Sequence, residues 1–406
     1  MIREMLLTKK TMKLKKKIRL YFYLLNSNIY KVFFIFWASL FYYLPINAEN
    51  GYNLWLRYYQ INDLKYIENY KKSVAEVYII GQTPIINSAT EELEKGIKGI
   101  IGNEIKYTSN FKNNSLIIGC YELLPNEIKN DIKNINISSL SEEGYLIKVV
   151  SSRNNYIIIT ANTDRGILYG VFSYLRLIQM EQSIEKLEII DVPKLKFRLL
   201  NHWDNLNRTV ERGYAGCSIW DWQRLPDYID QRYIDYARAN ASIGINGAVL
   251  TNVNANAIVL TRQYLEKVAA LANVFRKYGI KVYLTARFSA PKELGFLDTA
   301  DPLNEDVQKW WNEKAKEIYT LIPDFGGFLV KANSEGQPGP QEYERTHADG
   351  ANMLAKAIKP YGGIVMWRAF VYDHNVPDDR AKQAYNEFVP LDGKFEDNVL
   401  IQVKNG

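Results

Sequence analysis

The sequence predicts an α/β protein, namely a (β/α)8 TIM barrel truncated after its sixth strand and preceded by a smaller α+β domain. Short apolar segments recur from Arg198 onwards, most of them followed by a helical segment, and polar residues stand where nearly every apolar segment ends. Repeated strand–helix units require a parallel sheet with helices outside it, and polar strand ends favour a barrel. The sixth segment ends close to Gly406, so we expect the chain to be a fragment of a longer protein.

Residues 1–48 predict a signal peptide or an N-terminal membrane anchor. The segment holds nine Lys/Arg residues and one acid, and its basic part is followed by a thirteen-residue apolar run from Val32 to Leu44. That length suits the apolar region of a signal peptide better than a bilayer-spanning helix, with an uncleaved anchor as the alternative. We therefore expect export to the periplasm or the cell exterior, with Ala48 as a plausible last residue before cleavage.

Residues 49–192 predict the α+β domain. The segments GYLIKVV and YIIITAN are separated by Ser-Ser-Arg-Asn-Asn, which predicts an antiparallel pair of strands. Helical stretches are expected near residues 89–101 and 165–180. Catalytic residue types do not cluster here, so we interpret this part as a packing domain.

Residues 193–406 predict the incomplete barrel. Six strands are expected to begin near positions 198, 247, 280, 326, 363 and 398. Helices are expected over residues 261–279 and 304–322, and Gly279 stands where a helix C-cap belongs. A doubly wound sheet is the competing architecture, but no GxGxxG or phosphate-binding loop follows the first strand.

Charge and cysteine content exclude several classes of function. The formal net charge of +6 comes from the first 48 residues, and the weakly acidic remainder gives no reason to expect nucleic-acid binding. Cys120 and Cys217 match no metal or redox spacing, and we expect both in the core. We predict no metal site and no cofactor.

The residues at the predicted strand ends have a common chemical character. One carboxylic acid, Glu335, stands among cations, amides and a tryptophan, and this mixture suits a substrate that itself carries negative charge. It therefore indicates an acidic sugar and glycoside hydrolysis. The candidate substrate contacts are Trp203, Asn252, Val253, Arg287, Lys331, Asn333, Arg368 and Lys404.

Plainer interpretations of the same residues remain open. Lys331 and Glu335 could form a simple ion pair, Trp203 could belong to the core, and Arg368 could stack on the barrel rim. His202 is expected to be structural. If the fourth strand continues far enough, Lys331, Asn333 and Glu335 share one face.

Several long segments resemble family 67 α-glucuronidases, in the right order along the chain. They include LLNHWDNLNRTVERGYAGCSIWDW (199–222), LTNVNAN (250–256), FLVKANSEGQPGPQEYERTHADGANMLA (328–355), VMWRAFVY (365–372) and NVLIQVKNG (398–406). The segments GYNLWLRY (51–58) and TDRGILYGVFSYLRL (163–177) resemble that family's N-terminal domain.

The resemblance implies an enzyme that removes glucuronic or 4-O-methylglucuronic acid, α-1,2-linked to the terminal xylose of xylo-oligosaccharides, with inversion and without a metal. It implies that Glu335 is the general acid and that Lys331, Arg368 and Lys404 receive the uronic acid carboxylate and neighbouring hydroxyls. It also implies that Trp203 forms the wall of the sugar pocket and that Val253 lies beside the sugar's 4-position. On this reading Lys331 serves the sugar rather than Glu335.

One departure from the family puts activity in doubt. The family's water-activating carboxylates follow the sixth strand, beyond Gly406, so we expect this fragment to be inactive, and the C-terminal domain associated with homodimerisation is also missing. A non-catalytic uronic-acid-binding remnant is one alternative. Another is a barrel glycosidase of hexosaminidase type, which is disfavoured because Ser334, not an aspartate, precedes Glu335.

Overall fold

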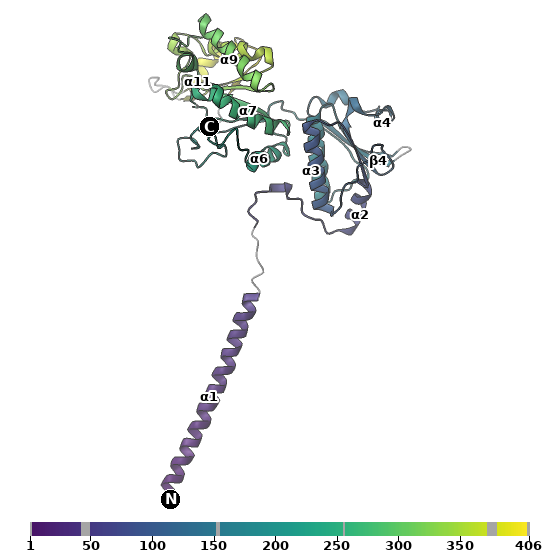
Figure 1. The fold of residues 1–406 in the computed structure, drawn as a ribbon, viewed down its shortest axis with the longest axis vertical. Coiled ribbons are helices and arrows are strands. Elements are labelled where there is room, and N and C mark those ends of the chain that lie inside the picture. Colours follow the sequence, from purple (N-terminus) through teal and green to yellow (C-terminus); the bar gives the residue numbers. More distant parts are fainter. Residues whose placement is uncertain (1, 42–48, 152–154, 255, 372–379, 404–406) are drawn as a thin grey trace. The chain divides into compact units, whose positions relative to one another are not determined.

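The computed structural model describes residues 2–41, 49–151, 155–254, 256–371 and 380–403 (Figure 1). Its contacts divide the chain into two compact units, Met1–Leu54 and Trp55–Gly406. In the first unit, helix α1 runs over Ile2–Phe41. Of the helices in the described ranges, none is both long and apolar enough to cross a bilayer. The signal peptide or anchor over residues 1–48 stays a prediction, and residues 42–48 lie outside the described ranges.

The second unit begins with a mixed five-stranded sheet in the order β1-β2-β4-β3-β5. Strands β1, β2 and β4 run parallel, whereas β3 runs antiparallel to both β4 and β5. The predicted antiparallel pair, β3 and β4, is therefore confirmed. The strand bounds are β1 Glu76–Ile80, β2 Ser115–Cys120, β3 Tyr145–Ser151, β4 Asn155–Ala161 and β5 Glu188–Asp191.

Helices cover both faces of this sheet. One buried cluster joins α3 and α5 to the sheet, and a second joins α4 to the opposite face. Helices α3 and α5 confirm the two predicted helices, although α3 begins earlier because Thr83 caps it and a proline suits its first turn. The bounds are α2 Leu64–Ser73, α3 Pro84–Ile101, α4 Asn126–Asp131 and α5 Asp164–Gln179.

The second sheet holds six strands in sequence order, and every neighbouring pair is parallel. All six predicted segments form strands, so the predicted parallel sheet is confirmed as a curled half-barrel. Among the described residues it is an open sheet with β6 and β11 at its edges. The bounds are β6 Leu199–Asn201, β7 Gly247–Val249, β8 Lys281–Thr285, β9 Gly327–Val330, β10 Ile364–Arg368 and β11 Val399–Gln402.

Each connection between successive strands of this sheet contains at least one helix, as a parallel sheet requires. Helices α7 and α9 confirm the two helices predicted here, and Gly279 has a left-handed φ of 69° just beyond α7. The bounds are α6 Gln231–Ala241, α7 Arg262–Arg276, α8 Ala290–Gly295, α9 Glu305–Leu321, α10 His347–Ile358 and α11 Arg380–Phe388.

Alternation along the strands gives the half-barrel an inner and an outer face. Val249, Tyr283, Leu329 and Met366 form a buried cluster of their own, while neighbours such as Phe328 and Trp367 belong to the larger core beneath the helices. Side chains two residues apart in a strand point the same way. This inner cluster therefore lines the concave side of the half-barrel.

A buried ion pair joins the first sheet's helices to the half-barrel. Arg238 of α6 binds Glu92 of α3 through two hydrogen bonds, Nε to Oε2 and Nη2 to Oε1, both 2.7 Å long. The Tyr58 hydroxyl donates to the same carboxylate at 2.5 Å. Because Glu92 is only 2% exposed and fully paired, this contact fixes α3 against α6.

The prediction for the two cysteines is half right. Cys120 is buried at the end of β2, where its thiol donates to Asp164 at 3.1 Å, and burial raises its pKa to about 12. Cys217 is exposed, so its predicted core position is wrong. It lies in the long connection between β6 and α6, whose surface course the local sequence did not reveal.

Candidate active site

A buried lysine lies at the carboxyl end of β9, on the inner face. Lys331 is 4% exposed and continues the inward alternation of Leu329. Its Nζ lies 2.5 Å from Oε2 of Glu335 and donates to Oδ1 of Asn254 at 3.0 Å. The plain ion pair, left open from the sequence, is therefore present in this structure, and a role of Lys331 toward a sugar stays a prediction.

The chain reaches this ion pair by a turn. Strand β9 ends at Val330, and Asn333 and Glu335 have left-handed φ values of 49° and 52°. The condition for a shared face, a strand that continues to Glu335, is therefore not met, and the turn, not alternation, brings Glu335 back to Lys331. Left-handed backbone at a residue other than glycine costs roughly 1–3 kcal/mol and collects at functional sites.

A second cation lies at the end of β10. Arg368 is 6% exposed, two residues beyond the inward-facing Met366. No residue that the structure describes gives its guanidinium a hydrogen bond or an ion pair. Burial lowers the pKa of Arg368, while nearby Glu335 acts in the opposite direction. Because burying an unpaired charge is costly, this position favours a ligand that brings negative charge.

An aromatic face lies beside that guanidinium. The Cζ atom of Arg368 is 5.8 Å from the ring centroid of Trp203, which follows β6 and is half-buried. Trp203 packs on the inner cluster that contains Val253, itself 3% exposed. The structure thus brings together five sequence-predicted residues, Trp203, Val253, Lys331, Glu335 and Arg368. Lys404 lies outside the described residues.

Comparison with known families covers nearly all of the second unit. The glycosyl hydrolase family 67 middle domain matches residues 177–406, and the family 67 N-terminus matches residues 54–174. The chain belongs to glycosyl hydrolase family 67. The resemblance found in the sequence is thereby confirmed.

Curated relatives of this family 67 chain are named as α-glucuronidases. Alpha-glucuronidase A of Emericella nidulans is 41% identical over 377 residues, which cover 88% of this chain and 43% of that protein. Alpha-glucuronidase of Hypocrea jecorina is 39% identical over 381 residues, covering 89% and 44%. The chain spans less than half the length of these relatives.

A solved structure has a similar fold. CpGH84D aligns with 81% of this chain and 52% of its own, at a TM-score of 0.52 and 13% sequence identity. At that identity the likeness concerns the fold alone.

Three further residues that the sequence predicted for the site form hydrogen bonds with the loops around it. Asn252 donates to Oδ1 of Asn205 at 3.1 Å and to the backbone of the loop after β6. Asn333 accepts the Gln341 backbone N–H at 3.2 Å. Arg287 binds Glu293 at 2.6 Å and Gln337 at 3.0 Å. Each therefore bonds within the fold here, and its predicted contact with substrate stays a prediction.

Sequence reasoning missed two contacts of the central ion pair. Arg212 places Nη2 3.4 Å from Oε1 of Glu335 and Nε 3.4 Å from Oε1 of Glu211. Asn254 accepts from Lys331, as described above. Arg212 stands at no strand end, because it lies on the long connection between β6 and α6. Only the quoted run 199–222 signalled its neighbourhood.

The histidine prediction is confirmed. The ring of His202 lies 2.7 Å from the Tyr236 hydroxyl and 3.1 Å from Oδ2 of Asp204. Both ring nitrogens therefore have partners within the fold, and the residue supports the strand that carries Trp203.

Proposed function

We propose that this chain supplies the uronate-binding and proton-donating part of an α-glucuronidase site. The substrate would be glucuronic or 4-O-methylglucuronic acid, α-1,2-linked to the terminal xylose of xylo-oligosaccharides, cleaved with inversion. The observation that carries the proposal is the buried Arg368 guanidinium, which forms no hydrogen bond or ion pair with the described residues and lies near Glu335 of the Lys331–Glu335 pair. The names of the relatives support the reaction class.

Uronate binding follows from the geometry of the two cations. A guanidinium binds a carboxylate through two parallel hydrogen bonds, and an ammonium adds a point charge. Arg368 and Lys331 end neighbouring strands, β10 and β9, on the same inner face. A sugar carboxylate between them would replace the missing partner of Arg368, and Trp203 would offer its flat face to the sugar ring.

Proton donation falls to Glu335. Lys331 and Arg212 both contact its carboxylate, and nearby cations favour the ionised form. When the sugar carboxylate pairs with Lys331, the ionised form of Glu335 loses part of its stabilisation, and Glu335 can bind a proton. In an inverting reaction the acid gives this proton to the departing glycosidic oxygen, while a second carboxylate takes one from the attacking water.

The test uses a chimera in which this chain replaces the matching part of the Emericella nidulans relative. Glu335→Gln should lower kcat/KM for a glucuronic-acid-substituted xylo-oligosaccharide by about 10²–10⁴-fold, the usual contribution of a general acid. The same variant should keep most activity on a glucuronide with an acidic phenol leaving group, which needs no proton. Equal losses on both substrates, or no loss on either, would remove Glu335 from this role.

A further inference from the structure

A cavity lies at the end of the half-barrel where the strands begin, opposite the end that carries Lys331 and Arg368. Its volume is about 550 Å³, within the range of about 300–1,000 Å³ typical of small-molecule sites. The first residues of β8 and β10 line it, together with the segment 193–197 and residues 141–143 of the first sheet's domain. Arg368 and Lys331 are not among its lining residues.

A tyrosine fixed between two glycines lines this cavity. Tyr283 is 3% exposed, and a Cβ at Gly326 would lie 2.1 Å from its Cζ atom. A Cβ at Gly247 would lie 2.7 Å from its Cε2 atom, so the ring has no room to move on either side. Within the described part of the chain its hydroxyl has no hydrogen-bond partner. Burial raises the pKa of Tyr283 to about 12, so the hydroxyl remains a donor at neutral pH.

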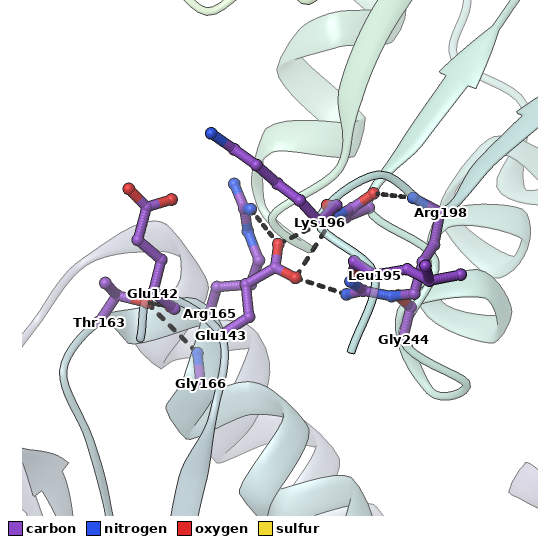
Figure 2. Close-up of polar contacts among 10 residues, drawn as sticks. Glu142, Glu143, Thr163, Arg165, Gly166, Leu195, Lys196, Arg198 and Gly244 are labelled. Carbon is purple, nitrogen blue, oxygen red and sulfur yellow. Dashed lines mark hydrogen bonds and ion pairs between the residues drawn. The ribbon is translucent and has the colours of Figure 1, made fainter. Parts of the chain in front are cut away.

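The buried carboxylate that lines this cavity, Glu143, is already neutralised by two arginines. Glu143 pairs with Arg165 through Oε1 and with Nη2 of Arg198 through Oε2 at 2.5 Å (Figure 2). Asn246 donates to it as well, at 3.0 Å. Burial alone would raise its pKa, but these hydrogen bonds outweigh burial and lower the pKa of Glu143. With two guanidiniums on one carboxylate, Glu143 leaves an excess of positive charge beside the cavity.

Three lysines add to that excess. Lys194, Lys196 and Lys281 line the cavity, the first two exposed and Lys281 half-buried, and within the described ranges no carboxylate lies within ion-pair distance of them. Lys281 lies two residues before Tyr283 in β8 and therefore on the same inner face. Figure 2 shows the Lys196 side chain extending past Arg165. The lining acid Glu142 is exposed and offsets only part of this charge.

We propose that this cavity binds a small oxyanion, a carboxylate or a phosphate group, held by the Tyr283 hydroxyl and by Lys196 and Lys281. Such a ligand would accept a hydrogen bond from the Tyr283 hydroxyl and be attracted by the lysines that line the cavity. Carboxylate and phosphate share this chemistry, so a sugar acid and a phosphate ester are both candidates. The proposal is independent of the proposed glucuronidase function, since it concerns the end of the sheet where the strands begin.

The experiment titrates the full chain carrying Arg368→Gln, which silences the first anion site, with inorganic phosphate and separately with glucuronic acid by calorimetry. We expect saturable binding of at least one anion, weakened by added salt. Lys196→Gln/Lys281→Gln should weaken it at least about tenfold, because a hydrogen bond to a charged group contributes about that factor. Binding of phosphate alone indicates a phosphate ester, and binding of glucuronic acid alone indicates a sugar acid.

Two matched variants complete the test. Tyr283→Phe keeps the ring between the glycines and should weaken binding severalfold without changing the thermal melt. Lys309→Gln/Lys316→Gln removes the same charge from exposed positions on α9 and should leave affinity unchanged. The proposal is overturned if neither anion binds the Arg368→Gln chain, or if the two lysine pairs reduce affinity equally.

Discussion

Two carboxylates, one near the start and one near the end of the strands of the six-stranded sheet, have contrasting surroundings. Glu143, beside the strand starts, is 8% exposed and is bound by two guanidiniums and an amide. Glu335, beyond the strand ends, has a 28% exposed side chain, a left-handed backbone, one lysine at 2.5 Å and one arginine at 3.4 Å. A fully enclosed and satisfied carboxylate holds two domains together, whereas an accessible one on a strained turn can exchange partners.

Two arginines, Arg198 and Arg368, differ in the same way. Arg198 is fully engaged, with Glu143 and with the backbone oxygens of Gly244 and Leu195. Arg368 is better buried, at 6% exposure, but forms no hydrogen bond or ion pair with the residues the structure describes. The guanidinium near the strand starts is thus used within the fold, whereas the one at the strand ends keeps its hydrogen-bond donors available, as the proposed uronate site requires.

The largest expected effect is on stability at the strand starts. Glu143→Ala leaves two half-buried guanidiniums without their carboxylate and should lower the free energy of unfolding by about 3 kcal/mol, the lower end for broken buried ion pairs. Glu335→Ala leaves the buried Lys331 ammonium with Asn254 as its remaining partner and should cost about 1–3 kcal/mol. The cost should be smaller than at Glu143, because one cation rather than two loses a short contact and the Glu335 side chain is 28% exposed. Urea unfolding of both variants measures the difference, and equal costs would erase the distinction between the two carboxylates.

A pair of glycines provides the next comparison. Gly326→Ala forces a methyl group into the Tyr283 ring, and overpacking of this kind should cost about 1–3 kcal/mol. Gly336, beyond β9, has φ +73° but no atom within 4 Å of an added Cβ. Gly336→Ala should therefore cost only about 1 kcal/mol, from its left-handed backbone. Thermal and urea unfolding of both variants measure the two costs. A larger cost at Gly336 than at Gly326 would contradict the rigid placement of Tyr283.

The smallest effect is a pH dependence. The pKa of Glu143 in the folded protein lies below its ordinary value of 4.5, so the unfolded chain binds more protons in that range. Its contribution to stability is fully present above pH 4.5 and is lost as the pH falls through the lowered pKa. Below pH 4.5, urea midpoints of Glu143→Gln should therefore decline less steeply with falling pH than those of the unsubstituted chain. Parallel declines would show that Glu143 is not responsible.

Periodicity and strand-end chemistry were enough to predict the six parallel strands and the gathering of Trp203, Lys331 and Arg368. These features depend on local pattern and on a general rule for where parallel strands end. The end of β9 at Val330 was not predictable, because left-handed backbone at Asn333 and Glu335 contradicts local preference. Arg212 and Glu143 were missed because their contacts join segments far apart in the sequence. Cys217 was misplaced because a long connection carries no periodic signal of burial.

The central claim is that the strand ends of this half-barrel bind a uronate through Arg368. Calorimetric titration of the chain with glucuronic acid and with neutral glucose tests it most directly, with Arg368→Gln as the variant and Arg262→Gln, an exposed arginine on α7, as the control. We expect glucuronic acid to bind more tightly than glucose, and this preference to disappear in Arg368→Gln but not in Arg262→Gln. Equal binding of the two sugars, or an unchanged preference in Arg368→Gln, would contradict it.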